Sequence, residues 1–243
     1  MARNVQKHPP RDGQTRRQRI EEQRAQARRE DRRRTALIVG TASVLAIVLV
    51  VGVVFAIQYQ NGHDPKTKPI ASFGVSAAAA QCSPEVSKAS TQSQIHVGPG
   101  TNSPNTTFVK YETVPPMFGP HFAVPAPFGT TFYTVRDAPK IETLVHNLEH
   151  GYTLVWYDST ITGDQLDELK GLSTRIPAAG TPKFIVSAWD PAHGTFPSGK
   201  HVAFSHWGQN TGYMQLCGKV SGEAIQTFVE QHPYTDSPEP NGA

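Results

Sequence analysis

Two histidines and a glutamate at H-x-x-E-H spacing are the residues of this chain best suited to chemistry. His146, Glu149 and His150 lie within 144–157, LVHNLEHGYTLVWY. Residues four apart on a helix point the same way, so the two imidazoles fall one turn apart with the carboxylate between them in projection. This arrangement suits a metal site or an acid/base pair. Two histidines alone do not complete a metal site, so further ligands are needed.

An amphipathic helix must position these groups. Ile141, Leu144, Val145 and Leu148 recur at i, i+3, i+4 and i+7, which predicts a helix over 139–150 with one buried stripe. The candidate groups fall on its opposite, polar face. Without a cover, that face would simply be solvated.

The loop 115–129, PPMFGPHFAVPAPFG, is the candidate cover. Its prolines and glycines exclude regular structure, and its phenylalanines need burial. If the loop folds over the helix, His121 joins His146 and His150 in a three-histidine site. Glu149 would then be a fourth ligand, an outer-shell partner or a base.

The ligand types favour zinc or copper, with a small ligand as the alternative occupant. Zinc accepts imidazole and carboxylate, whereas Met117 or Met214 approaching the site would favour copper, because thioether sulfur is soft. Both methionines are otherwise core fillers. H-x-x-E-H also occurs in inverted zinc peptidases, where Glu149 would be the catalytic base. We disfavour a hydrolase because the helix is short and Gly151 leads directly into an apolar strand.

The charge of the chain is divided between two parts. Residues 1–34 carry 12 Arg and Lys against 5 Asp and Glu, or +7, and the remaining 11 basic and 15 acidic residues give −4. Between them, the 22 uncharged residues 36–57 would form a helix of about 33 Å, which matches a hydrocarbon core of about 30 Å. The run is longer than the apolar region of a signal peptide, about 7–15 residues, so an uncleaved anchor is favoured.

The basic residues fix the expected topology and partners. Arg32, Arg33 and Arg34 precede the span, so the positive-inside rule places the N-terminus in the cytoplasm and the C-terminal domain outside the cell membrane. The basic tail is expected to bind anionic lipid headgroups, and no nucleic acid is expected because no aromatic or folded scaffold accompanies the charge. A protein partner is not identifiable.

Cys82 and Cys217 are the two cysteines of the chain, and both fall on the outer side. An oxidising compartment permits a disulfide between them, with two unpaired thiols as the alternative. A redox C-x-x-C motif is excluded by their spacing. The chain also has no nucleophile elbow, phosphate loop or dinucleotide fingerprint.

The expected organisation is a tail (1–34), a transmembrane helix (35–58), a linker (59–81), an extracytoplasmic domain (82–235) and a disordered end (236–243). The domain is expected to be an α/β (α+β) sandwich, with a thioredoxin-like order as the leading architecture. Its expected strands are 107–113, 130–135, 152–157, 183–189 and 201–207. Asp137, Thr162 with Gln165, and Ser221 are expected to cap three helices, the first of which is 139–150.

The chain resembles a bacterial family known as domain of unknown function 3105. The resemblance covers 95–231, and its most specific part is HNLEHG at 146–151, supported by Gly119-Pro120-His121 and Trp207-Gly208. It implies a single-pass membrane protein with an extracytoplasmic domain, and it supplies no reaction. Met117-Phe118 and Gln209 depart from the family pattern and make the mouth of a site more apolar and less basic. An anionic ligand is therefore disfavoured.

Binding of a metal or small ligand outside the membrane is the function these residues favour, without catalysis. The main alternative is a non-catalytic scaffold of the cell envelope that exposes a partner-binding surface. Its marker would be a contiguous apolar patch of Phe118, Phe122 and Phe128.

Overall fold

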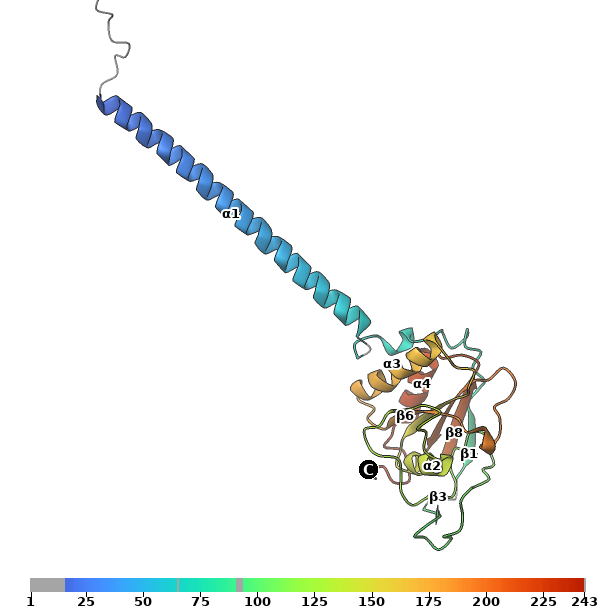
Figure 1. Ribbon diagram of the computed structural model, residues 1–243. Helices are drawn as coiled ribbons and strands as arrows, with labels where there is room; N and C mark the ends of the chain where they lie inside the picture. The colour runs from blue at the N-terminus through green and yellow to red at the C-terminus, as the bar shows by residue number, and fades with distance from the viewer. Residues whose placement is uncertain (1–15, 65, 91–93, 243) are drawn as a thin grey trace, which may run out of the picture. The chain divides into compact units, whose positions relative to one another are not determined.

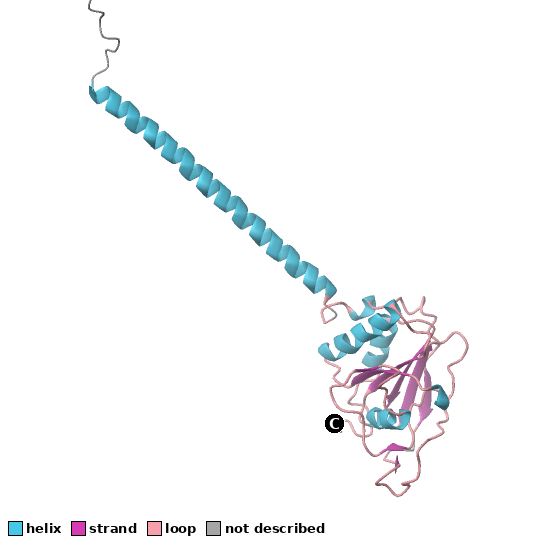
Figure 2. Ribbon diagram, viewed as in Figure 1, coloured by secondary structure: helices cyan, strands magenta, loops and turns pink. Residues whose placement is uncertain are grey.

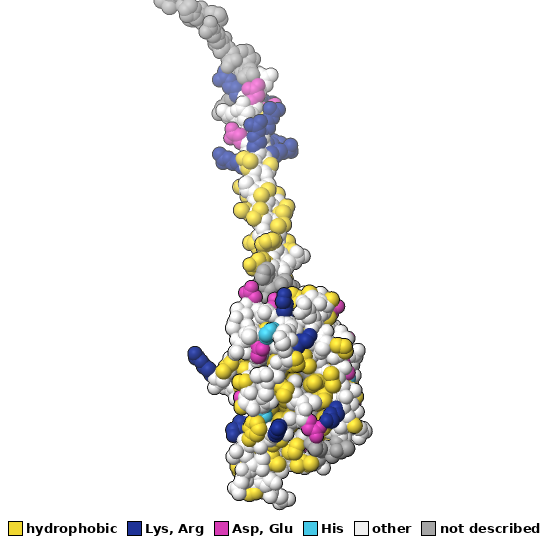
Figure 3. Space-filling model, turned by 90° about the vertical axis from the view of Figure 1, so that its right-hand side faces the viewer, with side chains coloured by type: hydrophobic (Ala, Val, Ile, Leu, Met, Phe, Trp, Pro, Cys, Tyr) yellow, Lys and Arg dark blue, Asp and Glu magenta, His cyan; other side chains and the backbone are white. Residues whose placement is uncertain are grey.

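The computed structural model describes residues 16–64, 66–90 and 94–242, and the chain divides into two compact units, Met1–Gln60 and Asn61–Ala243 (Figure 1). The described residues of the first unit belong to one helix, α1 (Arg16–His63), which ends three residues beyond the unit. A basic stretch of α1 is followed by a continuous apolar stretch (Figure 3). The helix is long and apolar enough to cross a membrane, in agreement with the prediction for 36–57.

The strands of the second unit are β1 (Val86–Ala89), β2 (His96–Val97), β3 (His121–Phe122), β4 (Phe132–Tyr133), β5 (Thr153–Tyr157), β6 (Phe184–Ala188), β7 (Val202–Trp207) and β8 (Thr211–Cys217). Six of them form a mixed sheet in the order β1-β8-β7-β5-β6-β4 (Figure 2). Strands β4, β6 and β5 are parallel, and β7, β8 and β1 follow in antiparallel pairs. Strands β2 and β3 pair separately and in parallel.

Helices cover both faces of this sheet. They are α2 (Ile141–Glu149), α3 (Asp164–Ala178) and α4 (Gly222–Gln231), with short 3-10 turns η1 (Ile70–Ser72) and η2 (Pro191–His193). Alternate residues of β5 enter two separate cores. Val155 and Tyr157 pack with α3 and α4, while Leu154 and Trp156 pack with the apolar stripe of α2. The result is a mixed α/β domain, as expected, with α2 on one face and α3 and α4 on the other.

Two of the three predicted helix caps are wrong. The Asp137 carboxylate accepts hydrogen bonds from Thr134 and closes a turn, so α2 begins after Lys140 without a side-chain cap. The Gln165 side chain accepts a bond from the N–H of Val220, and Gly163 precedes α3 instead of a capping box. In each case the side chain has a competing backbone donor.

The third cap is confirmed, because the Ser221 hydroxyl accepts a hydrogen bond from the N–H of Ala224 at the start of α4. The expected strand at 107–113 is absent from the structure. The N–H of Val109 instead donates to the Glu142 carboxylate at 2.8 Å, so a side chain of α2 holds this segment rather than a sheet.

The compact unit extends beyond the expected 82–235 at both ends. Within the expected linker, Phe73 is buried against Gly171 and Gly222, because its ring needs an apolar cover. Residues 237–242, which fall in the expected disordered end, form a C-terminal strap on the domain. Lys183 Nζ donates to the carbonyls of Pro240 and Gly242 at 2.8 and 2.6 Å, which holds the strap in place.

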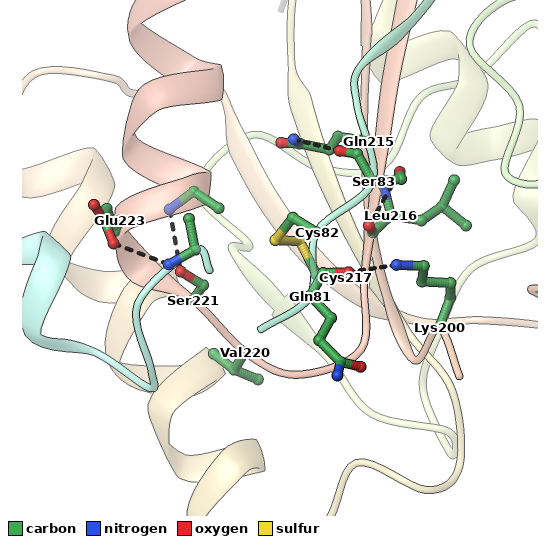
Figure 4. The surroundings of a disulfide bond; sticks show 12 residues. Gln81, Cys82, Ser83, Lys200, Gln215, Leu216, Cys217, Val220, Ser221 and Glu223 are labelled. Atoms are coloured by element: carbon green, nitrogen blue, oxygen red, sulfur yellow. Dashed lines mark hydrogen bonds between the residues drawn. A yellow bond between two sulfur atoms is a disulfide. The ribbon is translucent and has the colours of Figure 1, made fainter. Parts of the chain in front are cut away.

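The sulfur atoms of Cys82 and Cys217 lie 1.98 Å apart, at disulfide distance (Figure 4). The pair ties the segment before β1 to the end of β8. Hydrogen bonds between Ser83 and Leu216 continue this attachment along the edge of the sheet. Ala77 is held in turn by the Glu223 carboxylate, which accepts its N–H at 2.9 Å.

Candidate metal centre

The C-terminal end of α2 is fixed by Gly151. Its φ of +90° is left-handed, and a Cβ there would lie 2.2 Å from the carbonyl oxygen of Tyr234. Only glycine fits this position, so the helix stops and the chain turns directly into β5. The polar groups of the last helical turns are thereby held beside the segment that follows α4.

The loop 115–129 lies over the polar face of α2, as expected. Asn147 clamps it, because its side-chain amide donates to the carbonyl of Ala126 at 3.0 Å and its oxygen accepts the Ala126 N–H at 2.9 Å. His146 Nδ1 lies 2.6 Å from the carbonyl oxygen of Phe122 and donates to it. Asn147 was not singled out from the sequence, where it reads as one more polar residue of the helix.

Four side chains converge beneath this loop. The potential ligand atoms of His96, His121, His146 and Glu149 lie within 4.8 Å of one another. His121 and Glu149 are fully buried, His146 is almost so, and the His96 side chain is 35% exposed. The imidazole centroids of His96, His121 and His146 are 4.8 to 4.9 Å apart. The structure therefore brings together three of the four predicted residues and adds His96.

His96 reaches the cluster through a strand pairing. It lies on β2 directly opposite His121 on β3. The sequence places these two residues 25 positions apart with no shared motif, so local spacing contains no signal for the pairing. The sequence therefore gives no reason to include His96 among the candidate ligands.

The hydrogen bonds around the cluster orient the imidazoles as ligands. His121 Nδ1 donates to the carbonyl of Gly119 at 2.8 Å, which leaves Nε2 as the ring nitrogen available to a ligand. That atom is 3.0 Å from Oε2 of Glu149, yet neither atom makes a hydrogen bond of proper geometry. His96 Nε2 is buried and also lacks a partner, 3.9 Å from the same carboxylate oxygen. Carbonyl-anchored imidazoles facing a carboxylate are typical of metal sites.

The electrostatics favour the ligating protonation states. Burial lowers the pKa of His146 to about 4. The hydrogen bond to Phe122 raises this pKa, and the neighbouring imidazoles lower it further. Burial raises the pKa of Glu149, but the His121 ring and the N–H of Gln94 outweigh it, and the net pKa lies below the usual range. Near neutral pH the cluster thus contains a neutral imidazole at His146 and an ionised carboxylate.

His150 lies beside the cluster, and the structure groups His96 with the other three in its place. Its Nε2 is 3.1 Å from Nε2 of His146 and 3.4 Å from Oε2 of Glu239 on the strap. The ring of His150 is one helical turn beyond His146, where Gly242 packs closely against it. The cluster therefore contains His96 where the sequence predicted His150, and the His150 side chain contacts Glu239 and Gly242 of the strap.

The strap is bonded directly to the end of α2. The N–H of Glu239 donates to the carbonyl of Glu149 at 3.0 Å, and Lys183 Nζ donates to the carbonyl of His150 at 2.8 Å. Gln94 links the strap to α2, since its side-chain amide donates to Glu239 at 2.8 Å and its N–H donates to Glu149. The strap thus covers the flank of the cluster at His150.

The remaining sequence candidates lie elsewhere. Met214 packs among the residues of the α2 core, and Met117 lies against Gly212. Phe118 packs on Trp207 with centroids 5.9 Å apart, and Phe128 is 64% exposed. The contiguous phenylalanine patch expected of a scaffold is therefore not formed by these residues.

A comparison with known protein families identifies the family of this domain. The sequence model of a family described as "Protein of unknown function (DUF3105)" matches residues 103–243. The chain belongs to this family. No curated protein and no solved structure matches the chain significantly. The DUF3105 match contains His121, His146 and Glu149, whereas His96 precedes it, so the cluster is completed by a segment upstream of the matched residues.

Proposed function

We propose that this DUF3105 domain binds one transition-metal ion, with zinc preferred, between His96, His121, His146 and Glu149. The observation that carries the proposal is a set of buried atoms that face one another without a hydrogen bond of proper geometry, Nε2 of His96 and His121 and Oε2 of Glu149. Buried polar atoms left unsatisfied cost about 1–3 kcal/mol each. A cation among them removes this cost and converts facing lone pairs into ligands.

The spacing of the cluster fits zinc after a small contraction. With zinc–ligand bonds of about 2.0–2.1 Å, tetrahedral ligand atoms are roughly 3.3 Å apart. The ligand atoms here lie within 4.8 Å of one another, so the most distant pair would close by about an ångström or more. Since His96 is the most exposed of the four, we expect it to move most on binding.

The donor set favours zinc over copper(I) and favours metal retention over hydrolysis. Three imidazoles and a carboxylate are ligands that zinc accepts readily, and within the described residues neither Met117 nor Met214 belongs to the cluster. Four protein ligands close a zinc site, while catalytic zinc keeps a position for water. With Glu149 occupied as a ligand, no carboxylate of the cluster remains as a general base, which argues against the hydrolase alternative.

We further propose a thioredoxin-like fold and an extracytoplasmic location for the domain. The order β4-β6-β5-β7-β8, with β7 and β8 antiparallel, is the strand order of thioredoxin-like sheets and supports the first point. The basic residues before the apolar part of α1 support the second. Protease added to intact cells should cleave the domain and spare an N-terminal epitope tag, and the reverse pattern would contradict this orientation.

Metal analysis of the full-length chain tests the proposal. The chain should be purified in detergent without a His tag, because the segments before residue 82 and after residue 235 pack on the domain. After zinc loading and desalting, the wild type should retain one equivalent per chain. His121→Ala and Glu149→Gln should retain far less.

His201→Ala is the matched control, since His201 bonds Asp158 outside the cluster. It should retain zinc like the wild type. Equal zinc content in the wild type, His121→Ala and Glu149→Gln would refute the site. Circular dichroism of each variant separates loss of ligands from loss of folding, and Glu149→Gln is nearly isosteric for that purpose.

A further inference from the structure

A cavity of about 560 Å³ lies outside the metal cluster. It is lined by Tyr157, the last residue of β5, and by Trp189, which directly follows β6. These are the carboxyl ends of two parallel strands, the edge at which open α/β sheets bind ligands. Its volume also falls within the range of small-molecule sites, about 300–1,000 Å³.

The cavity presents ring surfaces whose polar atoms are already satisfied. Trp189 Nε1 donates to the carbonyl of Gly194 at 2.7 Å, and the Tyr157 hydroxyl donates to the carbonyl of Tyr133 at 3.1 Å. Phe196 stacks on Trp189 with centroids 5.3 Å apart. What these residues offer to an occupant is therefore mainly carbon surface, which suits an apolar ring.

One polar group of the wall is held in a defined orientation. His201 Nδ1 lies 2.8 Å from Oδ2 of Asp158 and donates to it, and Thr160 bonds the other carboxylate oxygen. In the neutral imidazole this leaves a lone pair on Nε2, which no residue in the described part of the chain hydrogen-bonds. Lys200, also in the wall, donates its ammonium to the carbonyl of Gln81.

We infer that this cavity binds a small uncharged aromatic molecule carrying a hydroxyl group. The ring lies against Trp189 and Phe196, and the hydroxyl donates a hydrogen bond to Nε2 of His201. The charged side chains of the wall are engaged within the protein, because Asp158 accepts hydrogen bonds from Thr160 and His201 and Lys200 donates to the carbonyl of Gln81. An uncharged occupant needs no partner from either of them. The inference is independent of the metal site, since none of these residues belongs to the cluster.

Ligand-observed NMR titration of the full-length chain tests this assignment. The probes are para-ethylphenol and para-ethylanisole, which have the same ring and differ in the hydroxyl donor, with protein-free micelles as the blank. At mildly alkaline pH the phenol should bind saturably and about fivefold more tightly, the equivalent of one ordinary hydrogen bond.

His201→Asn should abolish that preference, because the asparagine amide can replace Nδ1 on Asp158 but has no counterpart of Nε2. Comparing the ratio of the two affinities between wild type and variant cancels the partition of each probe into detergent. Phe196→Ala should weaken both probes about tenfold. Phe128→Ala, which removes an exposed phenylalanine outside the cavity, should weaken neither.

Absence of saturable binding to the wild type would overturn the inference. So would a hydroxyl preference that persists in His201→Asn, because the donor would then be bonding elsewhere. Since the two probes are compared on the unaltered chain first, the hydroxyl preference is tested even if a substitution impairs folding.

Discussion

Replacing Asn147 by alanine should release the loop 115–129 from α2 and weaken both the domain and its metal site. Asn147 is fully buried and bonds both the N–H and the carbonyl of Ala126, itself 2% exposed. The substitution leaves two buried backbone groups without hydrogen-bond partners, which costs about 1–3 kcal/mol each. We therefore expect the free energy of unfolding to fall by about 2–5 kcal/mol, the upper part of the range applying if no water enters.

Urea denaturation of the full-length chain, followed by tryptophan fluorescence, measures this change. Asn105→Ala is the matched control, because Asn105 is exposed in a loop and its loss should change stability by no more than about 0.5 kcal/mol. If Asn147→Ala unfolds at the same urea concentration as Asn105→Ala, the two bonds do not clamp the loop.

The same variant tests the link between the loop and the metal. The loop carries His121 and the Phe122 carbonyl that orients His146. Its release should therefore weaken zinc binding, measured by competition with a chelator, by at least about tenfold. Unchanged zinc affinity in a destabilised Asn147→Ala domain would show that the loop does not position the ligands.

Three further outcomes follow from the structure. The unreduced, unfolded chain should show no reactive thiol, and a titratable thiol would reject the pairing of Cys82 with Cys217. Reduction should destabilise the domain by up to about 5 kcal/mol, since the two cysteines are 135 residues apart. Lys183→Met should loosen the strap and speed zinc release to a chelator, whereas Lys170→Met, at an exposed lysine, should not. Equal rates of zinc release in the two variants would show that the strap does not retain the metal. Burial raises the pKa of Asp158, but hydrogen bonds from Thr160 and His201 outweigh it and hold the pKa below its ordinary 3.8. Its ionised form therefore stabilises the fold above that value, and the contribution is lost as pH falls through the lowered pKa. Asp158→Asn should flatten the acid limb of a stability–pH curve, and an unchanged limb would contradict the shift.

The sequence was informative wherever the signal is local. The stripe of Ile141, Leu144, Val145 and Leu148 predicted α2, and the polar face of that helix contains two of the four clustered residues. The order of strands and helices likewise predicted an α/β domain. Both predictions rest on residue patterns that repeat within a few positions, and such patterns can be read directly from the sequence.

The remaining features depend on contacts between distant segments. His96 enters the cluster only because β2 pairs with β3, and His150 contacts a strap more than 80 residues downstream. Asp137 and Gln165 had the right residue types for helix caps, but nearer or tertiary donors captured their side chains. The capture of Gln165 is invisible to a local pattern because Val220 is 55 residues away, whereas Thr134 is a local competitor for Asp137.

X-ray absorption spectroscopy of the zinc-loaded chain, wild type against His96→Ala, tests the central claim most directly. The wild type should show four nitrogen or oxygen neighbours at about 2.0–2.1 Å with outer-shell scattering from three imidazoles, and His96→Ala should lose one imidazole. A sulfur neighbour at about 2.3 Å, a shell of water oxygens without imidazole, or a spectrum unchanged by His96→Ala would contradict the proposed centre.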